Sequence, residues 1–260
     1  MSPRQFSNKT IASVAALVFF ATCSYIGRKN LLDCFTDSPV PEFCRGEPFG
    51  LSLFPQPRLF PGASTRFEEI FQSEMQDFQS HPGLKALMTE VAAQTRTSAE
   101  ARAKGQELGQ ELVRKGISRL PPQDLDEWNR IRLLLAQGSD AVCAALWSGR
   151  LDQDLLVPAL SSLPEPDSRA WFRFSSRAGI LELESVSPIP ADSTAVIEGL
   201  DVIAQTLAPP DRQHFLQTLD KGVDVPPADG CAAVRTLMIG AQQLQPALRA
   251  RFLRALASGQ

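Results

Sequence analysis

The chain has 260 residues, 43% of them apolar, and a formal net charge of −3 at neutral pH. A chain of this length and composition can bury a core and suits one domain or two small ones. The weak negative charge argues against nucleic acid as the main partner, because binding nucleic acid normally needs a basic face. Arginine outnumbers lysine and alanine is abundant, which indicates a bacterium with a GC-rich genome.

The first feature along the chain is an apolar run from Ile11 to Gly27 that holds no charged residue and has basic residues on both sides. As a helix this run covers about 25 Å, near the lower limit for crossing the hydrocarbon core of a bilayer. We predict a short cytoplasmic N-terminus at 1–9 and a transmembrane signal anchor at 10–27. The membrane is then the first expected partner of the chain.

Two other fates of this run stay open at the level of sequence. It resembles a signal peptide with a cleavage site at Ala21-Thr22-Cys23, or a lipoprotein signal in which Cys23 is acylated. Basic residues are almost balanced around the run, so charge does not decide its orientation. We favour a single-pass protein of the inner membrane with its C-terminal domain in the periplasm, the alternative being a cytoplasmic domain held at the inner face.

Five cysteines fall into two groups, one near the membrane and one far along the chain. If Cys23 lies in lipid or is acylated, the others can pair in an oxidising periplasm as Cys34 with Cys44 and Cys143 with Cys231. We expect no metal site and no cofactor, because no Cys-x-x-Cys or Cys/His cluster is present. Buried free thiols are the alternative for Cys143 and Cys231.

A proline-rich segment at 28–63 follows the membrane run, and prolines prevent it from forming a continuous helix. We predict a tether. It also carries Phe43, Phe49, Phe54 and Phe60, an unusual number of aromatic residues for a solvated linker. Part of the segment is therefore expected to pack on the domain as a strap, with a docking segment for a partner as the alternative.

Residues 64–118 are predicted to form an N-terminal helical pair. A capping box at Thr65 starts the first helix, whose Phe67, Ile70, Phe71, Met75 and Phe78 share one face. A second, long helical pattern runs from Leu84 to Ile117. Its middle has few large apolar side chains and is either a solvated helix or a loop, and Gly105 and Gly109 are small enough to admit another helix.

Residues 119–260 contain a faint internal repeat with a period of about 43 residues. Leu-Pro-x-x-Asp-x-x-x-Trp-x-Arg begins at Leu120 and again at Leu163, with a looser copy at Leu207. Proline and an acid suit a first helical turn, and the aromatic residue anchors that turn inward. Cys143 and Cys231 occupy equivalent positions after the first and third copies.

The fold class is therefore predicted to be all-α: a membrane helix, a proline-rich tether, and then stacked helical-hairpin repeats or an irregular bundle. The expected helices are 65–80, 83–117, 122–136, 139–148, 151–162, 166–184, 192–207, 210–221, 229–240 and 245–257.

Catalytic motifs are absent from the sequence, and we name no catalytic residue. His214 could form a base and nucleophile with Cys231 or Asp211, but a surface histidine is the better interpretation. Glu184-Ser185 is similar to a pair found at the catalytic acid of lytic transglycosylases, although only two residues match, and Glu182 and Glu184 are expected to be solvated charges.

Aromatic and basic residues of the C-terminal half have ordinary structural explanations. Trp128, Trp147 and Trp171 are expected in the core. Arg249, Arg251 and Arg254 are expected to complement the end of a C-terminal helix.

We therefore expect a membrane-tethered protein that binds another protein of the cell envelope, as an inhibitor or immunity factor, a chaperone or a scaffold. An enzyme acting on the cell wall or lipid is the alternative, and a protein that self-associates through Gly105 and Gly109 is a third possibility.

Overall fold

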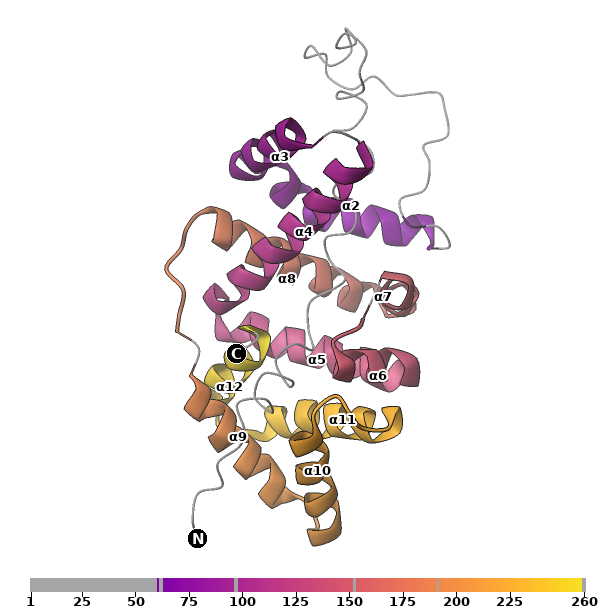
Figure 1. Cartoon of the computed structure of the whole chain (residues 1–260), viewed down its shortest axis with the longest axis vertical. Coiled ribbons are helices and arrows are strands. Elements are labelled where there is room, and N and C mark those ends of the chain that lie inside the picture. The colour runs from indigo at the N-terminus through magenta and orange to yellow at the C-terminus, as the bar shows by residue number, and fades with distance from the viewer. Residues whose placement is uncertain (1–59, 61–62, 96–97, 152, 191, 259–260) are drawn as a thin grey trace, which may run out of the picture.

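The computed structural model describes residues 60, 63–95, 98–151, 153–190 and 192–258, and within these ranges the regular structure is entirely helical (Figure 1). This confirms the all-α prediction for the described part. The elements, labelled as in Figure 1, are α2 (Thr65–Ser80), α3 (Pro82–Gln94), α4 (Ser98–Gly116), the 3-10 helix η3 (Ile117–Arg119), α5 (Pro122–Gly138), α6 (Asp140–Ser148), α7 (Gln153–Ser161), α8 (Glu165–Leu183), α9 (Ser193–Thr206), α10 (Pro209–Lys221), α11 (Pro227–Gln243) and α12 (Pro246–Ser258).

The expected membrane span at 10–27 lies outside the described residues, as do Cys23, Cys34, Cys44 and most of the tether. Among the helices that are described, none combines the length and the apolar character needed to cross a bilayer.

Helices that start with proline do so as the sequence predicted. A proline occupies one of the first two positions of α5, α8 and α10, as Pro122, Pro166 and Pro209. Backbone amides in the first turn have no partner within the helix, so proline, which lacks the amide hydrogen, costs no hydrogen bond there. The start of α2 differs from the prediction. Its cap is Ser64, whose Oγ accepts a hydrogen bond from the Phe67 amide at 3.1 Å, and Thr65 is already inside the helix.

The single helix predicted for 83–117 is wrong, because the chain breaks into α3 and α4. Thr95 adopts an extended conformation, and its Oγ1 donates to the Ala92 carbonyl in competition with the helical backbone bonds. The break lets α3 pack against α4 at Gly105, where an added Cβ would lie 2.8 Å from Met88 Cε. Gly105 therefore admits a helix of the same chain.

The helices succeed one another along the long axis of the molecule, from α3 at one end to α10 at the other (Figure 1). α8 lies between the N-terminal helices and the rest, packing on α2 and α4 and also on α5. α4 approaches α8 so closely that a Cβ on Gly116 would lie 1.8 Å from the Ala178 carbonyl oxygen. The described residues share one hydrophobic core.

α5 and α8, which carry the two best copies of the repeated motif, pack antiparallel. Three ion pairs cross between them, Asp124 with Arg177 at 3.0 Å, Glu127 with Arg173 at 3.1 Å and Arg130 with Asp167 at 2.7 Å. From one pair to the next, the residue number increases in α5 and decreases in α8, which is the order expected of antiparallel helices. The last pair joins the motif arginine of the first copy to the motif aspartate of the second.

All three tryptophans are buried, with exposed fractions of 4% or less, which confirms their predicted place in the core. Trp128 stacks on Phe174 with the ring centroids 6.1 Å apart. The Arg132 guanidinium also lies over the Trp128 ring, 4.5 Å from its centroid. Burial lowers the pKa of Arg132 to about 9, so the group still carries its charge at neutral pH.

Phe60, the last aromatic residue of the proline-rich segment, packs on the domain. Its ring meets Phe67 and Phe71 edge to face at 5.4 and 5.1 Å, and its amide donates to Glu68 Oε1 at 2.9 Å. Phe172 of α8 completes this aromatic cluster. Phe60 therefore packs on the domain, whereas residues 28–59 lie outside the described part and the strap stays a prediction.

Candidate functional site

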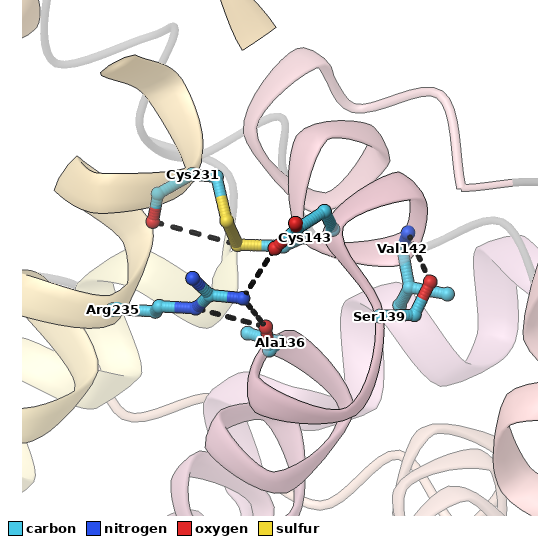
Figure 2. Close-up of a disulfide and its surroundings, with 7 residues drawn as sticks. Ala136, Ser139, Val142, Cys143, Cys231 and Arg235 are labelled. Atoms are coloured by element: carbon cyan, nitrogen blue, oxygen red, sulfur yellow. Dashed lines mark hydrogen bonds and ion pairs between the residues drawn. A yellow bond between two sulfur atoms is a disulfide. The ribbon is translucent and has the colours of Figure 1, made fainter. Parts of the chain in front are cut away.

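A disulfide joins α6 to α11 in the middle of the molecule (Figure 2). The Sγ atoms of Cys143 and Cys231 are 1.98 Å apart, and their Cα atoms 5.1 Å. Both residues are buried, at 0% and 4% exposure. The two cysteines that the sequence paired are thus at bonding distance, although 88 residues separate them.

Neighbouring side chains hold the two helices together around this disulfide. Arg235 of α11 donates from Nε and Nη2 to the Ala136 carbonyl at the end of α5, and Nη2 also reaches Asp140 Oδ1 at 2.8 Å (Figure 2). On the next turn, the Trp147 indole covers Gly230 and donates from Nε1 to the Gly222 carbonyl at 3.0 Å. The disulfide is therefore built into a tightly packed seam.

The pairing of His214 with Cys231 as base and nucleophile is excluded by this geometry, since the Cys231 sulfur is bonded to Cys143. His214 instead lies 3.3 Å from Asp229, measured from Nε2 to Oδ1, and its side chain is 55% exposed. It is a surface histidine, as expected.

Glu182 and Glu184 have different surroundings, although both were expected to be solvated. Glu182 forms an ion pair with Arg119 of η3, and its side chain is only 18% exposed. Glu184 lies exposed at the C-terminal end of α8.

The basic residues near the C-terminus do not cap α12, contrary to the prediction. Arg249 pairs with Asp126 of α5 at 2.9 Å, and Arg251 pairs with Asp192 at 2.7 Å and with Glu198 of α9. Arg254 is buried, and its Nη2 donates to the Leu120 carbonyl at 2.9 Å. These arginines attach α12 to other helices because their long side chains reach across the core boundary.

The end of the molecule formed by α9, α10 and the connection after α10, residues 193–226, carries a net negative charge. We refer to it as the acidic end. Its two bases are Arg212 and Lys221. Its five acids are Glu198, Asp201, Asp211, Asp220 and Asp224. The four aspartates are exposed, and none forms an ion pair within the described part of the chain.

The Arg212 guanidinium keeps its charge and is bound to the end of α9. Its Nε donates to the Ala204 carbonyl at 2.8 Å, and Nη2 donates to the carbonyls of Gln205 and Leu207. Two aliphatic side chains are exposed beside the aspartates, Val202 at 39% and Val223 at 46%. Figure 1 shows that the acidic end lies opposite α2 and α3.

Comparison with known proteins adds no relative: no family model matches the chain, and neither a curated protein nor a solved structure is significantly similar to it. Among the described residues, no group of three or more His, Cys, Asp or Glu side chains is arranged to hold a metal ion.

Sequence reasoning missed the acidic end, although a signal for it was present. Between residues 193 and 226 the chain has few basic residues, while aspartates recur along it. The exposed valines could not be found in this way, because Val202 follows the same apolar pattern as its buried neighbour Ile203.

Proposed function

We propose that this protein is exported, stays tethered to the inner membrane by its N-terminal segment, and binds another protein of the cell envelope through its acidic end. The observation that carries the binding proposal is the exposure of Val202 and Val223 among aspartates that have no ion-pair partner in the described part. Exposed aliphatic groups favour contact with a partner, and the surrounding charge selects a basic one.

The Cys143–Cys231 disulfide supports the export part of this proposal. Stable disulfides are typical of oxidising compartments such as the periplasm and are rare in a bacterial cytoplasm. Because both cysteines are buried, the bond serves structure and not exchange with external thiols. The membrane tether itself rests on the apolar run at 10–27.

A stack of helical hairpins would suit a binding protein, and the antiparallel packing of α5 on α8 supports such an arrangement. The first and third copies of the repeat, by contrast, meet through their second helices, α6 and α11. We propose that the repeat serves to extend the molecule from the strap at Phe60 to the acidic end.

The binding proposal is tested by site-specific photo-crosslinking in the native host. A photoreactive amino acid is placed at Val202, at Val223 or, as a matched control, at the exposed Glu90 of α3 at the opposite end. We expect the same adduct from both valine positions and none from Glu90. Adduct formation should weaken as salt rises and in an Asp201→Asn/Asp220→Asn variant, because screening and loss of charge both reduce attraction to a basic partner.

The proposed location in the cell is tested by measuring the intact mass of the full-length protein, extracted from membranes under thiol-alkylating conditions, with and without reduction. If Cys143 and Cys231 are alkylated only after reduction, the result supports export. If both are alkylated without reduction while the N-terminus is intact, the domain lies in the cytoplasm and the proposal is wrong.

A further inference from the structure

The connection between α8 and α9 differs from the others in the described part of the chain. It is the longest link between consecutive described helices, and every residue from 184 to 190 is exposed. Val186 and Ile189 are among the few large aliphatic side chains left in solvent, at 38% and 45% exposure. Figure 1 shows this connection as a long arc along the side of the molecule.

The segment leaves α8 through a strained residue. Ser185 has a φ of 53°, in the left-handed region that favours glycine, and it is the one non-glycine residue with positive φ in the described ranges. Pro188 and Pro190 then keep the chain extended. An extended, exposed backbone is the conformation in which endoproteases bind their substrates, and such segments are preferred sites of nicking.

Two contacts hold the segment against η3 and so limit access to it. Arg119 donates from Nε to the Val186 carbonyl, and the Ser118 carbonyl accepts from the Ile189 amide at 3.2 Å. The bond between Val186 and Ser187 lies between these contacts. The bonds that precede Pro188 and Pro190 are poor substrates, because proline lacks the amide hydrogen and restricts the residue before it.

We propose that the Val186–Ser187 peptide bond is a site of endoproteolytic processing by a protease that accepts an aliphatic residue before the scissile bond. The step is a hydrolysis. One water molecule is consumed, its hydroxyl completing the Val186 carboxyl group and its remaining hydrogen going to the new Ser187 amine.

Cleavage there produces two chains that stay covalently joined. Cys143 lies before the cut and Cys231 after it, so their disulfide links the piece that ends at Val186 to the piece that carries α9–α12. The packing of α11 on α5 and α6 also holds the two pieces together. Separation of α9–α12 therefore requires both cleavage and reduction. This inference is independent of the protein-binding proposal, since it uses neither the acidic end nor a partner.

The test uses the full-length, oxidised protein and pancreatic elastase, which cleaves after small aliphatic residues. The readout is the C-terminal fragment, identified by its mass and by an N-terminus of Ser-Pro-Ile-Pro, so that cuts in residues 1–59 do not interfere. We expect a single disulfide-linked species on a non-reducing gel and a separate C-terminal fragment after reduction. Helical circular dichroism should persist after the cut.

Three variants sharpen this test. Val186→Asp should abolish the cut, because an acid replaces the aliphatic side chain that elastase binds. Arg119→Ala should speed the cut by about fivefold, the factor that corresponds to one hydrogen bond holding the segment closed. Arg173→Ala is the matched control: it loses an exposed ion pair with Glu127 in another part of α8 and should be cleaved at the parent rate.

The proposal is overturned if the first cut in the described ranges is at a bond other than Val186–Ser187, or if the C-terminal fragment separates without reduction. An equal acceleration in Arg119→Ala and Arg173→Ala would also overturn it, since cleavage would then follow general loss of stability and not release of this segment.

Discussion

The indole of Trp147 fills the space that a side chain at residue 230 would need. A Cβ added to Gly230 would lie 2.3 Å from Trp147 Cδ1, closer than real Cβ atoms approach, and the obstructing atom belongs to a rigid ring. Trp147 is itself held by its hydrogen bond to the Gly222 carbonyl. The α6–α11 seam therefore depends on glycine at this position.

Gly230→Ala should destabilise the protein by about 1–3 kcal/mol, the usual cost of overpacking a core. Urea denaturation followed by circular dichroism measures the loss. Gly138→Ala is the control, because nothing lies within 4 Å of a Cβ at that position, and it should raise the unfolding free energy by up to about 1 kcal/mol. Equal effects of the two substitutions would contradict the packing argument.

Removal of the disulfide should lower stability by about 3–5 kcal/mol, because the bond restricts a long loop in the unfolded chain. The loop is defined by the separation of 88 residues between Cys143 and Cys231. A Cys143→Ala/Cys231→Ala variant and the reduced parent protein should unfold at similar urea concentrations, below that of the oxidised parent. Reductant should leave the midpoint of the double variant unchanged; a shift there would point to another bond.

Arg130 and Asp167 should show an energetic coupling that other exposed arginines do not share with Asp167. A double-mutant cycle with Arg130→Ala and Asp167→Ala should give about 0.5–1 kcal/mol, since the Asp167 side chain is 13% exposed but that of Arg130 is 45% exposed. The parallel cycle of Arg150 with Asp167 should give no coupling. A coupling near zero for Arg130 would mean that this pair does not align α5 with α8.

Glu111 should contribute stability that depends on pH. Its carboxylate accepts hydrogen bonds from Arg114 and also pairs with Lys115, which lowers the pKa of Glu111 from 4.5 to about 2. A lowered folded-state pKa stabilises the protein above pH 4.5, and this contribution is lost as the pH falls through that range toward 2.

The difference in unfolding free energy between the parent and Glu111→Gln should therefore shrink across this window. It should stay below about 1 kcal/mol even at pH 7, because the pair is exposed to solvent and salt. Glu107→Gln, an exposed change on the same helix, is the control. A difference that grows on acidification would contradict the assignment.

Most helices could be predicted from the sequence because their ends carry local chemical signals. Proline at the start of α5 and α10 and Asp192 at the cap of α9 act through the neighbouring backbone alone. A loop in the middle of 83–117 stayed open at the level of sequence, because that stretch has few large apolar side chains. The position of the break at Thr95 could not be fixed in this way.

Long-range contacts were harder to predict. The Cys143–Cys231 pair was inferred because a repeat placed both cysteines at matching positions. The repeat in the sequence thus indicated a contact between residues far apart along the chain. No such pattern accompanies Arg249, Arg251 and Arg254. Their partners lie on α5, at the start of α9 and at Leu120, which follows η3. Their spacing is compatible with arginines that complement the end of α12. Whether they do so or pair with other helices depends on how α12 packs on the rest of the protein.

The hydrogen bond from Arg254 to the Leu120 carbonyl has a consequence for synthesis of the chain. α12 packs on η3, α5 and α9, so part of the surface around Ile117 and Leu120 is covered by a helix that leaves the ribosome after all of them. Nascent chains stopped before α12 would leave apolar surface open and the Leu120 carbonyl without its arginine. Docking of α12 therefore covers apolar surface that chaperones and proteases can bind in shorter nascent chains.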